Sequence, residues 1–83
     1  MIPYRHLIYT LAVAEHGSVQ AASDSISISQ PALSAAIQKV EQNYGLKIFL
    51  RDRPNKLVLT PDGKRFIARA KVLMEGAEEF EDN

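Results

Sequence analysis

The chain has 83 residues, of which 46% are hydrophobic and 24% charged, and it contains no cysteine and no tryptophan. This is the composition of an ordinary globular protein, and the length allows one domain at most. Without cysteine, a disulfide framework and a thiolate metal site are excluded, and no apolar run approaches the roughly 20 residues of a membrane span or the core of a signal peptide. We expect a soluble cytoplasmic protein, and so small a fold would gain from a second copy that covers apolar surface.

Charge is distributed unevenly along the chain. Ten basic and ten acidic residues give a formal net charge of zero. All ten lysines and arginines and five of the acids lie in residues 1–73, whereas the other five acids lie in residues 74–83. Nine of the ten basic residues fall between Lys39 and Lys71. That basic stretch could attract phosphate, although a solvated surface is the alternative for a charge-rich segment taken alone.

The first part of the chain predicts two helices. A helix over about residues 4–15, ending at Gly17, is indicated by apolar residues at helical spacing, namely Tyr4, Leu7, Ile8, Leu11 and Ala14. Ser18 can then cap a short, alanine-rich second helix over about residues 19–25. The serines of Ser27-Ile28-Ser29 favour a break directly after it.

A third helix is predicted over about residues 30–44, with Ser29 as its cap, Pro31 in its first turn and Gly45 at its end. Its inward stripe is predicted to be Leu33, Ile37, Val40 and Tyr44. The opposite face is polar and nearly uncharged, and it carries Gln30, Ser34, Ala35, Gln38 and Gln42. Amides and hydroxyls suit hydrogen bonds to base edges, and a plain polar surface is the alternative for this face alone.

The last part of the chain predicts a hairpin and a long helix. Residues 46–50 and 57–59 are apolar enough for two short strands around a basic turn at 51–56. Thr60-Pro61-Asp62 is a strong helix start, and this final helix should run from about 61 into the high seventies. A heptad-like apolar stripe runs along it, formed by Phe66, Ala70, Leu73, Ala77 and Phe80. Because a helix of about 30 Å outreaches so small a core, we expect the stripe to pair with a second copy.

Helix, helix, short turn, helix and basic hairpin is the order of a winged helix-turn-helix, in which the second helix of the pair lies in the major groove of DNA. We therefore predict a mainly α fold, with a winged helix-turn-helix domain at residues 1–60 and a linker or dimerisation helix at 61–83 whose acidic end opens a hinge. Dimer symmetry would match an interrupted palindrome in double-stranded DNA.

The sequence resembles the DNA-binding domain of LysR-type transcriptional regulators, which are bacterial proteins, over nearly its entire length. The resemblance rests on Ala12-Val13-Ala14-Glu15-His16-Gly17-Ser18, Ser29-Gln30-Pro31-Ala32-Leu33-Ser34, Ile37, Glu41, Gly45, Leu46, Phe49, Arg51 and Leu59-Thr60-Pro61-Asp62-Gly63. It implies that the third helix is the recognition helix and that Gln30, Pro31 and Ser34 touch bases. It also implies that Arg53 or Lys56 reaches the minor groove from the wing, with Arg51 packing beside it or binding phosphate.

The remaining expected contacts are with the DNA backbone. We place Ser29, Gln38 and Lys39 there together with the wing residues Arg51, Arg53 and Lys56, and Lys64 and Arg65 are further candidates. The sequence departs from the family pattern at Val19, Gln20, Ser23 and Ala35. Ser23 needs a hydrogen-bond partner at the close contact between helices, and Ala35 removes one family-type contact.

Members of the resembled family usually carry an effector-binding domain after the linker helix, and that domain is absent from these 83 residues. A fragment cut after the linker helix and a short natural protein with a different control are both open, as is a tetramer for a full-length protein. We expect no enzymatic activity, no cofactor and no metal, because His6 and His16 lack clustered ligands and no nucleophile or phosphate-loop motif is present. Two other functions stay open: a sequence-neutral architectural DNA binder and a winged-helix protein-interaction module.

Overall fold

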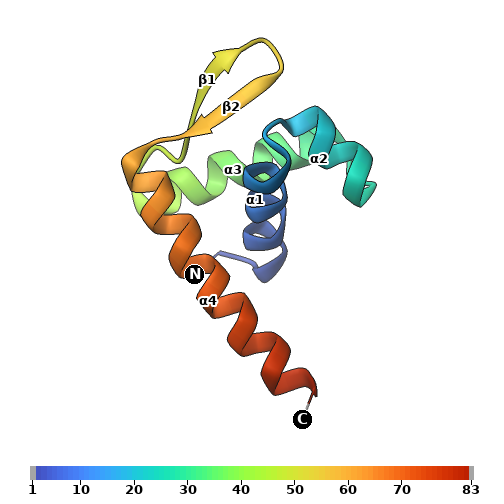
Figure 1. Cartoon of the computed structure of the whole chain (residues 1–83), viewed down its shortest axis with the longest axis vertical. Helices are drawn as coiled ribbons and strands as arrows, with labels where there is room; N and C mark the ends of the chain where they lie inside the picture. The colour runs from blue at the N-terminus through green and yellow to red at the C-terminus, as the bar shows by residue number, and fades with distance from the viewer. Residues whose placement is uncertain (1, 83) are drawn as a thin grey trace.

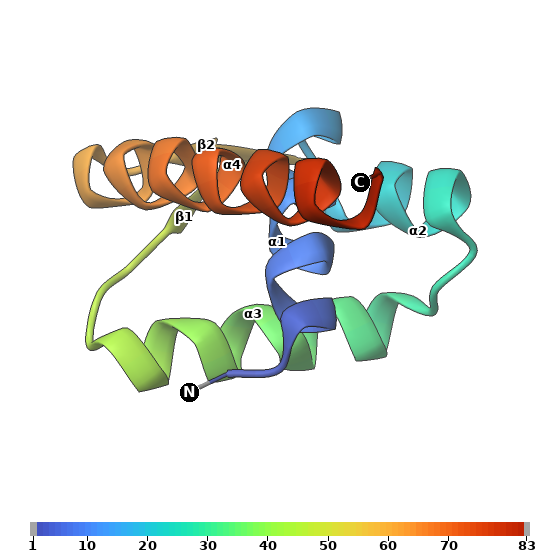
Figure 2. The same ribbon diagram turned by 90° about the horizontal axis from the view of Figure 1, so that it is seen from below.

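A computed structural model describes the backbone of residues 2–82 and their side chains, apart from those of residues 78, 79, 81 and 82. The elements in chain order are α1 (Tyr4–His16), α2 (Val19–Ile26), α3 (Gln30–Tyr44), β1 (Phe49–Arg53), β2 (Lys56–Leu59) and α4 (Pro61–Asp82). The predicted winged helix-turn-helix is confirmed: α1 to α3 form the body, β1 and β2 form the wing, and α4 extends away from the base of the wing (Figure 1). Figure 2 shows α1 lying between α3 and α4. Within residues 2–82, none of the helices has the length and apolar character that a membrane span requires.

Short-range hydrogen bonds end and begin the helices of the body where the sequence predicts. Gly17 and Gly45 follow α1 and α3 with φ angles of 78° and 63°, a left-handed conformation that glycine adopts without strain. The Ser18 hydroxyl accepts a hydrogen bond from the Ala21 amide at 3.0 Å, and the Ser29 hydroxyl accepts one from the Ala32 amide at 3.3 Å. These caps fix where α2 and α3 start, and with them the turn of the helix-turn-helix.

Ser23 finds its hydrogen-bond partner in the turn between α2 and α3. The Ser23 hydroxyl donates a 2.6 Å hydrogen bond to the carbonyl of Ile28, across the turn. Ser27, at the end of α2, takes a left-handed conformation with φ of 58°. The polar residue therefore stabilises the turn at the point where the sequence departs from the family pattern.

The buried face of α1 is not simply the set of apolar residues whose spacing predicts the helix. Leu7 is buried, but Tyr4 and Ile8 are 46% and 37% exposed, and Thr10, Ala12 and Val13 are also buried. The reason is that α1 packs against α2, α3 and α4, so its middle residues are surrounded from several sides. The buried Thr10 hydroxyl donates a 2.7 Å hydrogen bond to the carbonyl of His6, which offsets the cost of burying a polar group.

The first strand of the wing begins and ends later than predicted, and the turn is shorter. The strands are antiparallel, with Phe49 opposite Leu59 and Arg53 opposite Lys56, and the turn is reduced to Pro54 and Asn55. Residues 46–48, predicted to be strand, are irregular. The physical reason is that the carboxylate of Glu41 takes the amide hydrogen bond of Ile48 at 2.7 Å, so the ladder begins only at Phe49.

The exposure of some apolar residues on α3 and α4 also differs from the prediction. Tyr44, predicted to face inward, is 46% exposed, and its ring tilts against that of Phe66 at a centroid distance of 5.3 Å. On α4, Ile67 and Ala70 are each 5% exposed and belong to the buried interior, whereas Leu73 is 57% exposed. The helix continues to Asp82, beyond the predicted high seventies. The acidic side chains expected to open a hinge at 78, 79, 81 and 82 lie outside the described side chains.

Candidate nucleic-acid interface

The exposed face of α3 is the first component of the candidate interface. The three predicted base-contacting residues, Gln30, Pro31 and Ser34, are all exposed in the first two turns of α3. Gln38 continues the same face one turn later and is also exposed. Because these side chains bear no charge, they can approach base edges without a counter-ion, and glutamine can pair with the adenine edge. The residue before them, Ser29, is engaged as the cap of α3.

The wing stands next to this face and forms a groove with it. The groove has a volume of about 230 Å³ and is bounded by the start of α2, the start of α3 and the wing turn. Its polar lining consists of Ser18, Gln20, Gln30, Ser34, Arg51, Asn55 and Lys56. The structure thus brings two of the three predicted base contacts, Gln30 and Ser34, together with the predicted wing residues Arg51 and Lys56, whereas Pro31 and Arg53 do not line this groove.

Two of these groove residues, Gln20 and Asn55, were missed as functional candidates. Gln20 is exposed at the start of α2, and Asn55 forms the wing turn with Pro54. The sequence offered one signal for Gln20, because it lies two residues after the cap Ser18 and departs from the family pattern. For Asn55 the only signal was its place in the basic turn, because nothing local shows which turn residue faces α3.

Arg51 occupies the corner between α3 and the wing. Its guanidinium donates a 3.0 Å hydrogen bond to the carbonyl of Pro54 and so braces the wing turn. It also lines a second groove, between α3 and β1, with Ser34, Gln38, Glu41 and Lys47. One guanidinium can brace the wing and still present further N–H groups to an anion, and the binding of Arg51 to phosphate stays a prediction.

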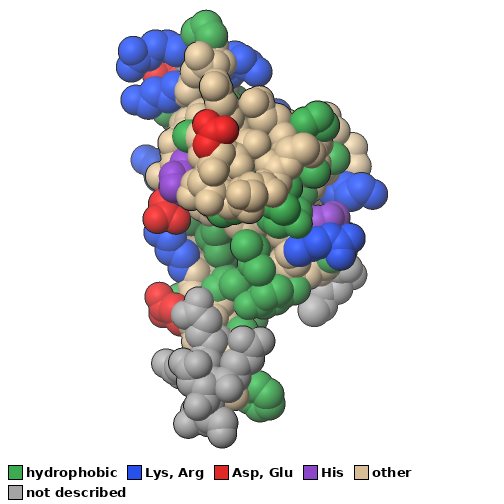
Figure 3. All heavy atoms as spheres, turned by 90° about the vertical axis from the view of Figure 1, so that its right-hand side faces the viewer, with side chains coloured by type: hydrophobic (Ala, Val, Ile, Leu, Met, Phe, Trp, Pro, Cys, Tyr) green, Lys and Arg blue, Asp and Glu red, His purple; other side chains and the backbone are tan. Residues whose placement is uncertain are grey.

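Arg53 and Lys56 lie opposite each other at the tip of the wing. The Arg53 guanidinium approaches the carboxylate of Asp52 at 3.5 Å, and the Arg53 side chain is 71% exposed. An ion pair this exposed contributes little free energy, so Arg53 can exchange it for a phosphate. Figure 3 shows Lys and Arg side chains gathered at the top of the molecule, where the wing lies.

Lys39 lies on the other flank of α3, away from the wing. Its charge acts on His6 of α1, and both residues line a shallow groove with Gln42 and Asn43. Burial lowers the pKa of His6 below its ordinary value of 6.5, and the positive charges of Arg5 and Lys39 lower it further. The Nδ1 atom of His6 is buried and meets no hydrogen-bond partner among the described residues. The cations that act on His6 thus come from two elements, Arg5 from α1 and Lys39 from α3.

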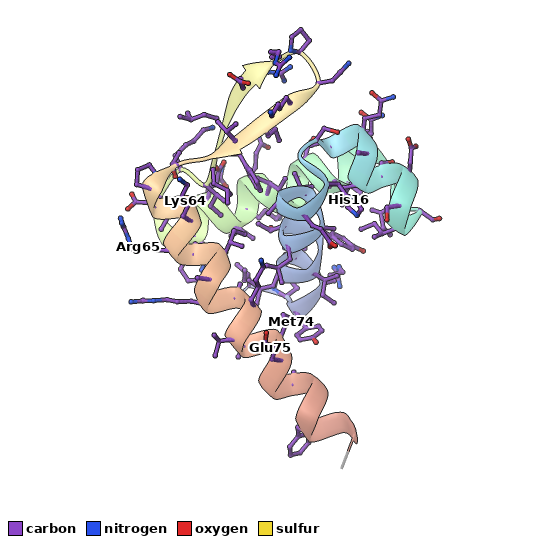
Figure 4. The ribbon with its side chains drawn as sticks, viewed as in Figure 1. His16, Lys64, Arg65, Met74 and Glu75 are labelled. Atoms are coloured by element: carbon purple, nitrogen blue, oxygen red, sulfur yellow. The ribbon has the colours of Figure 1, made fainter. Side chains whose placement is uncertain are left out.

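The predicted dimerisation stripe divides between two environments. Ala70 is buried against the body and Phe66 packs on Tyr44, whereas Leu73 and Phe80 are 57% and 84% exposed. An apolar groove of about 410 Å³ lies between α1, the end of α3 and α4, and it is lined by Leu7, Tyr44, Leu46, Phe66, Ala70 and Leu73, with Asp62, Arg65 and Arg69 alongside. Figure 4 shows Lys64 and Arg65 at the start of α4, near the base of the wing, and Met74 and Glu75 farther along the helix.

Comparison with known proteins identifies the fold and the family. Residues 4–64 match the family model of bacterial regulatory helix-turn-helix proteins of the lysR family. The chain is 36% identical over 69 residues to the uncharacterized HTH-type transcriptional regulator YvbU of Bacillus subtilis (strain 168), covering 83% of this chain and 24% of that protein. It is also 36% identical over 72 residues to the SDS degradation transcriptional activation protein of Pseudomonas sp. (strain ATCC 19151), covering 87% of this chain and 23% of that protein.

Solved structures agree in fold and include DNA complexes. The chain is 31% identical to a crystallised CbnR_DBD–DNA complex with a TM-score of 0.91, covering 98% of this chain and 92% of that one. It is 32% identical to the BenM_DBD/catB site 1 DNA complex, again with a TM-score of 0.91, covering 98% of this chain and 89% of that one. The chain spans about a quarter of the length of the curated relatives it matches. With the fold, the family model and these relatives in agreement, the chain belongs to the LysR family of bacterial helix-turn-helix regulatory proteins.

Proposed function

We propose that this chain is the sequence-specific DNA-binding domain of a bacterial transcriptional regulator, with α3 in the major groove and the wing at the minor groove. The observation that carries the proposal is the shared groove of Gln30, Ser34, Arg51 and Lys56, in which an uncharged recognition face adjoins a basic wing. Its fold matches that of two chains whose structures are named as DNA complexes. In this proposal residues 1–60 bind DNA and residues 61–83 form the linker helix.

The contacts divide into two kinds. Gln30, Pro31 and Ser34 read base edges, which gives preference for one sequence over another. Polar and cationic residues around them bind the DNA backbone or the minor groove, namely Ser29, Gln38, Lys39, Arg51, Arg53 and Lys56. Backbone contacts supply affinity that falls with salt, because each neutralised phosphate releases a counter-ion.

The protein acts as a dimer joined through α4, by the part of the stripe that lies beyond the body, namely Leu73, Ala77 and Phe80. Charge along α4 supports an antiparallel pairing, because Lys64, Arg65, Arg69 and Lys71 precede the five acids of residues 75–82. Antiparallel helices bring the basic half of one copy beside the acidic half of the other. The two recognition helices then face the half-sites of an interrupted palindrome.

The protein acts by binding in the bacterial cytoplasm and not by catalysis. The family and the relatives are transcriptional regulators, so the chain acts through binding and carries out no catalysis of its own. Because bacterial DNA lies in the cytoplasm, the same proposal assigns the protein to the nucleoid there.

The test begins by enriching duplexes from a random library on the wild-type protein. Fluorescence anisotropy then compares the enriched duplex with a scrambled duplex of equal length at several salt concentrations. We expect binding to the enriched duplex that is tighter by about tenfold or more and that weakens as salt rises. Equal binding to both duplexes would favour a sequence-neutral architectural role, and no binding to either would favour a protein-interaction module.

The wing supplies a matched control within the same experiment. Replacing Arg53 and Lys56 together with alanine should weaken binding to both duplexes and lower the salt slope by about one for each lost phosphate contact. The control replaces Arg5 with alanine, which removes an exposed positive charge from the start of α1, outside the wing and the paired helix α4. A salt slope that changes equally in both variants would remove the wing from the interface.

A further inference from the structure

Three elements meet at one buried residue, Ile48, which connects α3 to the wing and is 0% exposed. Ile48 lies in the segment that leads into β1. Glu41 near the end of α3 and Thr60 at the start of α4 both form hydrogen bonds with Ile48, and Thr60 forms another with Lys47 beside it. We call Glu41, Ile48, Thr60 and Gly63 the Ile48 junction. It lies at the base of the wing, where α4 begins to leave the body (Figure 1).

On the side of α3, the junction is held by Glu41. Its carboxylate accepts hydrogen bonds from the amides of Ile48 at 2.7 Å and Phe49 at 3.4 Å. Its backbone carbonyl accepts a third, from the amide of Leu46 at 3.2 Å. The Glu41 side chain is only 15% exposed, so these charge-assisted bonds are partly shielded from water. The recognition helix is therefore tied directly to the peptide that precedes β1.

On the side of α4, the same peptide is held by Thr60. The Thr60 amide donates to the carbonyl of Ile48 at 3.0 Å, and its hydroxyl donates to the carbonyl of Lys47. That hydroxyl also accepts a hydrogen bond from the Gly63 amide at 2.8 Å, which caps α4. One side chain thus fixes the start of α4 and joins it to the segment that Glu41 holds.

Gly63 brings the first turn of α4 against the backbone of Ile48. A β-carbon at this position would lie 2.1 Å from the carbonyl oxygen of Ile48 and 2.9 Å from its carbonyl carbon. Both neighbours are main-chain atoms, which cannot swing away as the end of a long side chain can. The close approach therefore requires glycine and leaves the first turn of α4 little freedom to tilt.

The first half of α4 determines where its far end lies. Ile67 and Ala70 are buried against the body, but Val72 and Leu73 are 68% and 57% exposed, so the body covers little of the helix beyond Ala70. At 1.5 Å per residue the helix is about 33 Å long, and a tilt of about 10° at its start would move its far end by about 6 Å. That displacement exceeds the 3.4 Å rise of one base pair.

We propose that Thr60 and Gly63 are positioning residues that, with Glu41, fix the angle between α3 and α4 and thereby select the spacing between half-sites that the dimer accepts. The inference rests on the proposed function, in which α4 joins the two copies. Neither residue touches DNA in this assignment; each acts through Ile48 on the placement of the recognition helix.

The first test measures the angle without DNA. Because the chain has no cysteine, spin labels can be placed at Gln42→Cys on α3 and Lys71→Cys on α4, both exposed, with excess unlabelled protein so that only distances within one chain are read. Electron–electron double resonance should give one narrow distance distribution for the parent and for Thr60→Ser, which keeps the hydroxyl. Thr60→Val should give a distribution that is displaced or broadened by several ångströms. An unchanged distribution in Thr60→Val overturns the proposal.

The second test measures half-site spacing. The duplex enriched on the parent is rebuilt with its half-sites moved one base pair closer and one base pair farther apart, and an isolated half-site serves as the control. The parent and Thr60→Ser should prefer one spacing by about tenfold, whereas Thr60→Val should bring the preference below about threefold with unchanged half-site affinity. Circular dichroism melts exclude unfolding, and Glu41→Gln, which keeps an acceptor for the Ile48 amide but loses the charge, provides a second variant with a smaller shift in the same direction.

The outcomes separate this inference from the proposed function. An unchanged spacing preference in Thr60→Val overturns the inference and leaves DNA binding intact. A parent that binds no duplex overturns the proposed function, and the distance measurement then decides whether the junction fixes the angle of α4.

Discussion

The body and the outer half of α4 differ in how far their apolar side chains are exposed to solvent. In the body, Val13, Leu33 and Val40 are 0% exposed and are enclosed by neighbouring elements of the same chain. Beyond Ala70, Leu73 and Phe80 are 57% and 84% exposed on the projecting helix (Figure 1). The body can therefore be stable through its own packing, whereas the outer half of α4 needs a second surface to bury its apolar residues.

The largest expected effect contrasts two leucines. Leu33→Ala removes a fully buried side chain from the body and should lower the free energy of unfolding by about 2–5 kcal/mol. Leu73→Ala, on the exposed part of α4, should change it by about 0.5 kcal/mol or less in the monomer. Urea denaturation at low protein concentration measures both. Equal losses would mean that Leu73 belongs to the core of a single chain.

The next effect concerns assembly. Leu73→Asp places a charge in the apolar stripe and should shift the protein from dimer to monomer, weakening binding to full palindromes by about 10²-fold more than binding to half-sites. Light scattering measures the mass, and fluorescence anisotropy measures the affinity for each duplex. Ala68→Asp introduces the same charge at an exposed position outside the stripe and should leave the mass unchanged. An unaltered mass in Leu73→Asp would show that the stripe does not pair copies.

A third effect belongs to the body alone. Gln30→Ala should weaken binding to the enriched duplex by about 1–3 kcal/mol and change binding to scrambled DNA much less, since it removes a base contact. Gln42→Ala removes the same amide from the far end of the exposed face of α3 and serves as the control. Anisotropy on both duplexes distinguishes them. Equal losses on the two duplexes would assign Gln30 to the backbone instead of to sequence reading.

The smallest expected effect is the pH dependence of body stability. Because the pKa of His6 is lowered in the folded chain, the unfolded chain binds the proton more readily. The free energy of unfolding should therefore be highest above the ordinary value of 6.5 and should fall as the pH drops from there toward the lowered pKa. Thermal melts across this window should show a flatter profile for His6→Gln. His16→Gln, at the exposed end of α1, is the control, and identical profiles for all three proteins would contradict the prediction.

Much of the fold was predictable because its signals are local. The caps Ser18 and Ser29, the helix-ending Gly17 and the start at Thr60 each act through a hydrogen bond or a backbone angle within a few residues. The order of elements followed from these signals. The candidate site was partly predictable as well, because the exposed face of α3 and the basic wing can each be identified from residue type and spacing.

Other features depended on elements far apart in the chain. The sequence did not indicate that Gln20 and Asn55 share a groove with Gln30, or that Lys39 lies beside His6 on the opposite flank. It also did not indicate which residues of α1 are buried, because periodicity identifies apolar positions but not how many neighbours surround a helix.

The sequence by itself therefore determined the kinds of element, their order and the residue types offered to DNA, since helix caps and periodic patterns act over one or two turns. Only the tertiary structure decided which apolar residues of α4 join the body, which flank of α3 each cation occupies and why Gly63 must lack a side chain. These features arise where segments distant in sequence pack together, as at Ile48, which is contacted by both α3 and α4 at the base of the wing.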